Sequence, residues 1–122
     1  MHKKPKPVQS IKKRRIFELL FKKGKTKKGR LLDLWVYEGP EILEEHRAGP
    51  LLAIMISRKA LAGAVQRNLL RRRIREAFKS LQFHIRPGIA ILIRAKYGQS
   101  GIPSYEVVDT ELRNLLARIS HE

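Results

Sequence analysis

Residues 60–81 read ALAGAVQRNLLRRRIREAFKSL, and this stretch decides how the chain can fold. Its apolar residues recur with the period of an α-helix. At 100° per residue, one side of the helix collects Leu70, Ile74, Ala77, Phe78 and Leu81. A neighbouring side collects Asn68, Arg71, Arg72, Arg75 and Lys79, with Arg67 at the margin and Leu69 and Arg73 outside both groups. We therefore predict a helix that packs through one face and presents cations on another.

Basic residues dominate the whole chain as well as this helix. Lys and Arg total 27 against 11 Asp and Glu, which gives a net charge of +16. Residues 1–30 hold thirteen bases and one acid, residues 31–56 hold five acids and one base, and residues 57–79 hold eight bases and one acid. A field of this sign attracts polyanions, so we expect nucleic acid as the partner. A solubilising charge and an anionic membrane surface are the alternatives.

Length and composition limit the class of protein. The 122 residues fit one domain, and no apolar run approaches the roughly 20 residues of a membrane span. The chain has no cysteine, which excludes disulfides and thiolate metal sites and is compatible with a reducing compartment. Residues 1–9 carry prolines among lysines and lack the apolar stretch of a signal peptide. We expect a flexible basic arm over residues 1–9, a single domain over residues 10–122 and a cytoplasmic location.

The N-terminal half predicts a helix followed by a strand. Ser10 is a candidate N-cap for a helix that runs to about Lys23, and Gly24 is its stop signal. Residues 25–30 read as a basic connector. Residues 31–38, LLDLWVYE, alternate in period two and are rich in aromatics, which is typical of a strand.

The C-terminal half completes a mixed domain. Residues 39–50 read as a loop because prolines and glycines lie at both ends, and residues 50–57 read as a strand paired antiparallel with the first. Residues 89–95, IAILIRA, predict a buried strand. A last helix starts near Ser104, with an apolar stripe of Val107 or Val108, Leu112, Leu115, Leu116 and Ile119. The order indicates an α/β (α+β) fold, with a small mixed sheet of about four strands and three helices.

Aromatic residues on the first helix and first strand suit single-stranded nucleic acid. Phe17 and Phe21 lie four residues apart, and Trp35 shares a strand face with Asp33 and Tyr37. We expect this face, the less apolar of the two, to be exposed at Asp33 and Trp35. Stacking on aromatic side chains beside a basic channel holds single strands. Core packing is the alternative for both phenylalanines.

Catalytic patterns are missing from the residues. His2, His46, His84 and His121 are scattered, and no pair has metal-ligand spacing. No Gly-x-Ser-x-Gly elbow and no phosphate-cradling P-loop occur. Glu41, Glu44 and Glu45 read as a solvated acidic loop rather than a cation site. We predict no catalytic residue and no metal site in the protein.

The stretch ISRKALAGAVQRNLLRRRIREAF, residues 56–78, resembles the signature of the protein component of bacterial ribonuclease P. The matching positions are Ser57, Arg58, Lys59, Ala64, Val65, Arg67, Asn68, Arg71, Arg72, Arg75, Ala77 and Phe78. The segment KKRRIFELLFKKGK resembles the family's first helix, with Phe17, Phe21 and Gly24 in register. The similarity covers most of residues 10–119.

The resemblance implies a fold, a partner and a reaction. The fold would be like that of ribosomal protein S5 domain 2, with the Arg-rich helix as the crossover. The partner would be a large catalytic RNA that removes the 5′ leader of precursor tRNA by hydrolysing one phosphodiester. Mg²⁺ held mainly by the RNA would perform the chemistry, and the protein alone would be inactive. Neither a membrane nor a small-molecule substrate is implied.

The resemblance also implies two sets of site residues. The first would contact the catalytic RNA: Arg67, Asn68, Arg71, Arg72 and Arg75, with Arg58 and Lys59. The second would line a cleft for the precursor's leader: Phe17, Phe21, Trp35, Ser57 and Arg94, with Lys59 as a further polar wall.

Three departures distinguish this sequence from the family pattern. Leu69 replaces the last arginine of an Arg-Asn-Arg motif, so that Arg73 is a candidate substitute. The stretch before Arg67 is one residue longer than usual, and Asp33 stands where the family's strand is uncharged.

Two other functions fit the composition. One is a non-catalytic structural RNA-binding protein of ribosomal type. The other is a DNA-binding regulator, which residues 67–79 disfavour because no helix and tight turn precede them.

Overall fold

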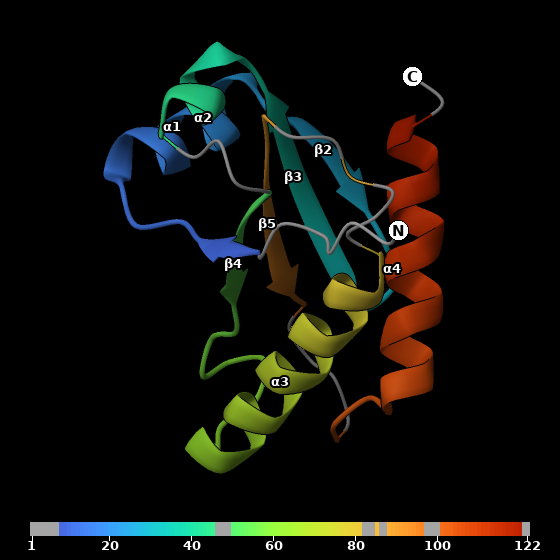
Figure 1. The fold of residues 1–122 in the computed structure, drawn as a ribbon. Helices are drawn as coiled ribbons and strands as arrows, with labels where there is room; N and C mark the ends of the chain where they lie inside the picture. Colours follow the sequence, from blue (N-terminus) through green and yellow to red (C-terminus); the bar gives the residue numbers. More distant parts are fainter. Residues whose placement is uncertain (1–7, 46–49, 82–84, 86–87, 97–100, 121–122) are drawn as a thin grey trace, which may run out of the picture.

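One mixed sheet of five strands organises the molecule (Figure 1). The computed structural model describes residues 8–45, 50–81, 85, 88–96 and 101–120. The strand order is β1-β4-β5-β3-β2. The strands are β1 (Gln9–Ser10), β2 (Lys25–Lys28), β3 (Leu32–Glu38), β4 (Leu51–Met55) and β5 (Ile89–Ala95). The helices are α1 (Arg14–Lys23), α2 (Pro40–Glu45), α3 (Ala64–Leu81) and α4 (Tyr105–Ser120). The predicted mixed α/β class is confirmed, with one strand more than expected.

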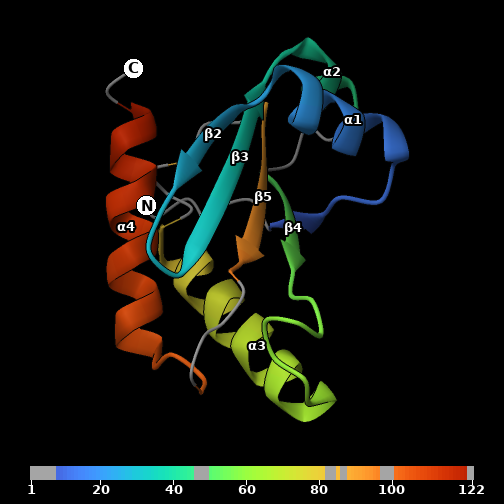
Figure 2. The same ribbon diagram turned by 180° about the vertical axis from the view of Figure 1, so that it is seen from behind.

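The sheet separates two apolar cores, because successive side chains of a strand point to opposite faces. On one face, Leu34 and Ile93 pack against α3 and α4. On the other face, Leu92 and the half-buried Trp35 pack with Leu20 of α1. The predicted alternation of β3 is thus confirmed. Figures 1 and 2 show α3 and α4 side by side, and α1 with α2 over one end of the sheet.

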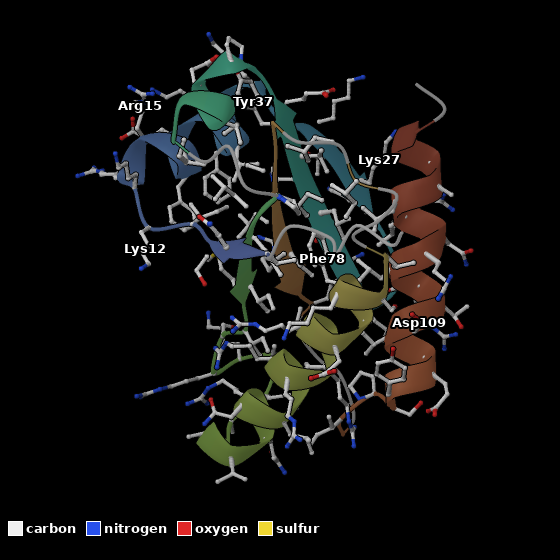
Figure 3. The ribbon with its side chains drawn as sticks, viewed as in Figure 1. Lys12, Arg15, Lys27, Tyr37, Phe78 and Asp109 are labelled. Carbon is white, nitrogen blue, oxygen red and sulfur yellow. The ribbon has the colours of Figure 1, made fainter. Side chains whose placement is uncertain are left out.

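The predicted inner face of α3 is also confirmed. Its five members are all buried: Leu70, Ile74, Ala77, Phe78 and Leu81. Phe78 is 0% exposed and lies between α3 and the sheet (Figure 3). The helix begins at Ala64 and not at residue 60. Before it, Ala60 N and Leu61 N both donate to Ser57 O at 3.1 Å, which turns the chain after β4.

The start of α1 differs from the prediction. Ser10 is not its cap, because Ser10 belongs to β1, which pairs in parallel with β4. The helix starts at Arg14, and Lys13 precedes it without a side-chain capping bond. Gly24 does end α1, but its φ of −71° is not left-handed. Glycine is needed there because a Cβ would lie 2.3 Å from Leu20 O.

The largest differences between the prediction and the structure concern which strands pair. Residues 25–28, expected as a connector, form β2 antiparallel to β3. The strand β4 does not pair with β3; it runs parallel to β5, which lies between them. β5 takes the centre because its residues are apolar on both faces and are almost all buried. Residues 40–45, expected within a loop, form α2, so the connection from β3 to β4 is no hairpin.

The last helix starts as predicted. Val107 N donates to Ser104 Oγ at 3.3 Å, which is an N-cap bond. Val108, Leu112 and Leu115 are buried against the main core. No helix among the described residues combines the length and apolar character that a membrane crossing requires. Residues 1–7 of the predicted arm lie outside the described part, while Gln9 belongs to β1.

Candidate nucleic-acid interface

The outer side of α3 carries a row of cations. We call Asn68, Arg71, Arg72, Arg75 and Lys79 the α3 cationic face. Four of them are exposed, and Arg71 is half-buried. Arg71 Nη1 donates to Asn68 Oδ1 at 2.9 Å, so that one turn of the helix orients this guanidinium. The face exists because helical spacing turns these residues away from the buried Leu70, Ile74 and Phe78.

No carboxylate of the described residues forms an ion pair with the α3 cationic face. Ion pairs between described side chains occur instead on α1 (Arg14–Glu18), on the sheet (Asp33 with Arg94 and Lys96) and on α4 (Arg113–Asp109). The mutual repulsion among the guanidiniums of the α3 cationic face is therefore not offset by an ion pair with any described carboxylate. A planar guanidinium matches phosphate in geometry, so this face is suited to a nucleic-acid backbone.

Two other arginines of α3 donate hydrogen bonds to backbone carbonyl oxygens of their own chain. Arg67 Nη1 donates to Leu61 O at 2.9 Å and to Ala62 O at 2.7 Å. Arg73 Nη1 donates to Pro103 O at 2.7 Å, which ties α3 to the segment before α4. Arg73, the proposed substitute for Leu69, is thus engaged with its own chain. Leu69 itself is 36% exposed, in agreement with its place outside the core stripe.

The other residues expected to bind RNA lie just before α3. Arg58 and Lys59 are exposed in the turn between β4 and α3. Ser57 is exposed too, and its Oγ accepts a hydrogen bond from Ala60 N at 3.2 Å. The role of Ser57 in a leader cleft stays a prediction.

Aromatic side chains meet on the α1 side of the sheet. The ring centroids of Phe21 and Trp35 lie 5.5 Å apart, with an edge-on interplanar angle of 68°. Phe21 is 52% exposed, while Phe17 and Trp35 are half-buried against the second core. Arg94 Cζ lies 4.7 Å from the centroid of Trp35, a cation–π contact. Four predicted leader-cleft residues, Phe17, Phe21, Trp35 and Arg94, therefore share this side, and Phe21 and Trp35 are partly open to solvent.

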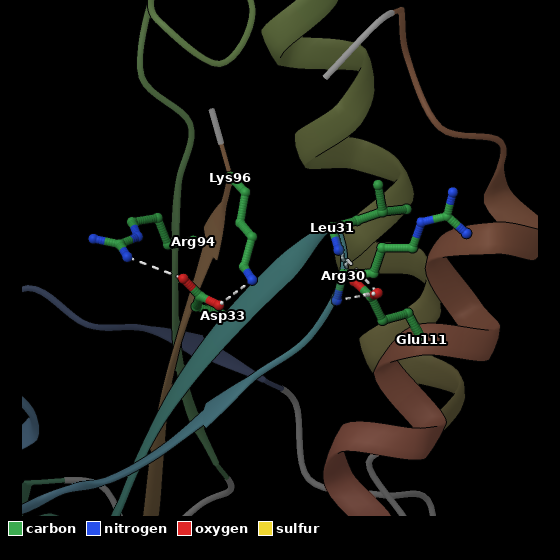
Figure 4. Close-up of polar contacts among 6 residues, drawn as sticks. All are labelled: Arg30, Leu31, Asp33, Arg94, Lys96 and Glu111. Atoms are coloured by element: carbon green, nitrogen blue, oxygen red, sulfur yellow. Dashed lines mark hydrogen bonds and ion pairs between the residues drawn. The ribbon is translucent and has the colours of Figure 1, made fainter. Parts of the chain in front are cut away.

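Asp33 is not exposed, contrary to the prediction. It is 3% exposed and lies opposite Arg94 in the β3–β5 register. Arg94 Nη2 donates to Asp33 Oδ2 at 3.0 Å, and Lys96 Nζ lies 3.3 Å from Oδ1 (Figure 4). A buried carboxylate needs such partners. Lys96 was missed from the sequence because a lone lysine after a strand shows nothing about cross-strand distance.

Two further carboxylates fix the frame around these surfaces. Glu111 of α4 accepts hydrogen bonds from Arg30 N at 2.8 Å and Leu31 N at 2.9 Å, which anchors the start of β3 (Figure 4). Tyr37 donates to Glu41 and so links β3 to α2. This hydrogen bond raises the pKa of the Tyr37 hydroxyl and is the main cause that lowers the pKa of the Glu41 carboxyl.

Within the described residues, no three His, Cys, Asp or Glu side chains come together as metal ligands would. The four histidines lie outside the described residues. The predictions that the protein carries no catalytic residue and no metal site stay predictions.

Comparison with known proteins gives one consistent match. A family model described as ribonuclease P matches residues 6–120. The ribonuclease P protein component of Picosynechococcus is 35% identical over 102 residues, which cover 84% of this chain and 82% of that protein. The Staphylococcus aureus ribonuclease P protein structure superposes with a TM-score of 0.74 at 28% identity, over 90% of this chain and 94% of that one. The Thermotoga maritima protein gives a TM-score of 0.70 at 25% identity, over 90% and 96%.

Proposed function

This chain belongs to the family of ribonuclease P protein components, and from that premise we propose which of its surfaces bind which RNA. The α3 cationic face, with Arg67, Arg58 and Lys59 beside it, binds the catalytic RNA. The aromatic side of the sheet holds the single-stranded 5′ leader of precursor tRNA. The two surfaces together hold the substrate against the enzyme's RNA while one phosphodiester is hydrolysed.

The α3 cationic face carries the first half of the proposal. Its guanidiniums have no carboxylate partner among the described side chains, although the chain has 11 acids. Phosphates of a folded RNA supply the missing counter-charge and release bound counterions. A row of arginines favours close contact with a structured backbone because each fork can make two parallel hydrogen bonds.

The aromatic side of the sheet supports the second half. Phe21 and Trp35 offer partly open ring surface next to a cation. Unpaired bases stack on such rings, and the contact does not depend strongly on base identity. This tolerance suits a leader whose sequence varies from one precursor to the next.

We place the reaction centre in the RNA, with Mg²⁺ held mainly by that RNA. The protein's contribution is electrostatic and positional. Two RNAs repel each other, and a subunit of net charge +16 lowers this repulsion where they meet. Less Mg²⁺ is then needed for screening. A chain without cysteine fits a reducing compartment such as the cytoplasm.

Reconstitution with a bacterial ribonuclease P RNA tests this function. The cleavage rate is measured against Mg²⁺ concentration, for one precursor with a full leader and one with a single leader nucleotide. We expect the protein to lower the Mg²⁺ requirement and to improve the leader-bearing precursor more. The protein without RNA should cleave neither. An equal effect on both precursors would instead favour a structural RNA-binding role of ribosomal type.

A further inference from the structure

A buried acid lies next to Arg94, within the surface that we assign to the leader. Asp33 is 3% exposed, whereas the side chains of Arg94 and Lys96 above it are 41% and 33% exposed. An acid among the cations of an RNA-binding surface reduces attraction for phosphate. The contacts of Asp33 indicate what it contributes in return.

Asp33 and Trp35 together fix one guanidinium. Asp33 and Trp35 stand two residues apart on the same face of β3, and Arg94 lies opposite Asp33 on β5. Asp33 holds Nη2 of Arg94 at 3.0 Å, while Cζ lies 4.7 Å from the Trp35 ring centroid. Phe21 contacts the same ring from α1 at 5.5 Å. The guanidinium is thus constrained by an ion pair on one side and by an indole on the other.

A guanidinium held in this way recognises a different chemical group than a free one. Asp33 already offsets its charge, so that less of its field is left for a phosphate. Its plane and its remaining N–H donors are still available, because the side chain is 41% exposed and one nitrogen contacts the acid. Unpaired bases are stacked on arginine planes and aromatic rings and are read along their edges by hydrogen bonds.

We propose that Asp33 is a positioning residue that holds Arg94 against Trp35, so that this site takes an unpaired nucleobase of the leader rather than a phosphate. The proposal rests on the assigned leader surface and adds what that surface selects. Lys96 completes the arrangement: its Nζ lies 3.3 Å from Asp33 Oδ1, an oxygen that accepts no hydrogen bond among the described residues. The carboxylate therefore depends on both cations.

The test uses the holoenzyme reconstituted with a bacterial ribonuclease P RNA and a set of precursors with one abasic nucleotide at successive leader positions. For the wild type, removing the base at the contacting position should weaken precursor binding about tenfold. We call the ratio of the affinities for the intact and the abasic precursor the abasic contrast. In Asp33→Asn this abasic contrast should fall below about threefold. The salt dependence of binding should become steeper by about 0.7 as freed Arg94 meets a phosphate.

Asp109→Asn is the matched control. It removes the same charge from α4, where Asp109 pairs with Arg113 at 2.9 Å. It should change neither the abasic contrast nor the salt slope. Trp35 is the single tryptophan, so its fluorescence reports on the cluster without RNA. Acrylamide should quench Trp35 more strongly in Asp33→Asn than in the wild type or in Asp109→Asn, because Arg94 no longer covers the ring.

Three results would overturn the inference: an abasic contrast that Asp33→Asn retains, a salt slope that does not steepen, or unchanged quenching of Trp35. If Asp33→Asn does not fold, Arg94→Lys decides. This substitution keeps the charge but removes the planar group, so the abasic contrast should be lost while the salt dependence of binding stays unchanged. If Arg94→Lys retains the abasic contrast, the inference is again rejected. A wild-type holoenzyme that binds both leader lengths equally refutes the proposed function itself, whereas normal leader dependence with an unaffected Asp33→Asn refutes the inference alone.

Discussion

The α3 cationic face and the Asp33–Arg94–Trp35 site use arginine in opposite ways. On α3, Arg72 and Arg75 are exposed and have no described acid within ion-pair distance. On the sheet, Arg94 is held by a buried carboxylate and an indole ring. The first arrangement leaves charge for a partner to neutralise, and the second leaves shape and a stacking surface. One chain can therefore separate attraction for RNA backbone from contact with RNA bases.

This difference has a measurable consequence. Binding by uncompensated cations weakens steeply with salt, because each phosphate contact releases counterions. Stacking on a ring or on an ion-paired guanidinium makes no phosphate contact and releases no counterion, so it depends on salt much less. Substitutions in the two regions should thus reduce RNA affinity by different amounts, and the two reductions should depend differently on salt concentration.

The largest effect should come from a substitution in the apolar core that supports the α3 cationic face. Phe78→Ala removes a side chain that is 0% exposed in the main core, and we expect a loss of about 3–5 kcal/mol in the free energy of unfolding. Urea unfolding measures it. Val65→Ala, on the same helix but 82% exposed, should stay within about 0.5 kcal/mol. Equal losses would mean that the inner face of α3 is not what places its cations.

Trp35→Ala should act on one class of substrate. We expect it to weaken binding of leader-bearing precursor by about 1–3 kcal/mol, the range for one stacked base. Binding of mature tRNA, which has no leader, should not change. Phe21→Ala should show the same selectivity with a smaller loss, because Phe21 meets Trp35 only edge-on. A uniform loss on both substrates would contradict the assignment of this surface.

Arg72→Ala tests the electrostatic half of the comparison. If Arg72 contacts one phosphate, the slope of log affinity against log salt should decrease by about one unit. Arg113→Ala is the control, because Arg113 pairs with Asp109 on α4 at 2.9 Å. Its slope should match the wild type. An unchanged slope for Arg72→Ala would show that this side chain faces only solvent in the complex.

Within α3, Arg67 and Arg75 should separate stability from binding. Arg67→Ala removes hydrogen bonds to Leu61 O and Ala62 O, and we expect a loss of about 1 kcal/mol of folding stability. Arg75→Ala should leave stability within about 0.5 kcal/mol. Both should weaken RNA binding. Thermal unfolding of the two variants provides the measurement, and identical melting behaviour would show that the Arg67 bonds add nothing.

The smallest effect concerns acid sensitivity beside α1. The hydrogen bond from Tyr37 is the main cause of the lowered Glu41 pKa. A lowered pKa adds stability above the unfolded-state pKa, and this stability is lost as pH falls through the folded-state value. Tyr37→Phe should raise the Glu41 pKa toward its ordinary value and shrink that pH-dependent part. Carboxyl titration by NMR checks the direction; a Glu41 pKa that does not rise would refute it.

Local patterns predicted a large share of the fold. Helical spacing identified the buried side of α3, from Leu70 to Leu81, because periodicity follows from backbone geometry alone. The alternation in β3, the stop at Gly24 and the cap at Ser104 were predicted for the same reason. Each depends on neighbours within a few residues.

Pairings between distant segments could not be predicted in this way. β4 lies beside β5 rather than β3, and Ser10 pairs with β4 instead of capping α1. Asp33 was expected to be exposed because its strand neighbours say nothing about Arg94, which is 61 residues away in sequence. The hydrogen bonds from Arg67 to Leu61 O and Ala62 O could not be predicted either, because they require the turn after β4 to fold back on the start of α3.

By itself the sequence determined the charge of +16, its concentration on one side of a helix and the residues that this helix buries. The charge follows from composition, and the two faces follow from the helical period. Neither depends on how the helix packs against the rest of the chain. Only the tertiary structure decided which arginines pair with an acid and which do not. The reason is that an ion pair depends on a distance of a few ångströms, here between residues that lie 61 positions apart in the sequence. The Asp33–Arg94–Trp35 site is therefore a property of the sheet's register, whereas the α3 cationic face follows from helical spacing.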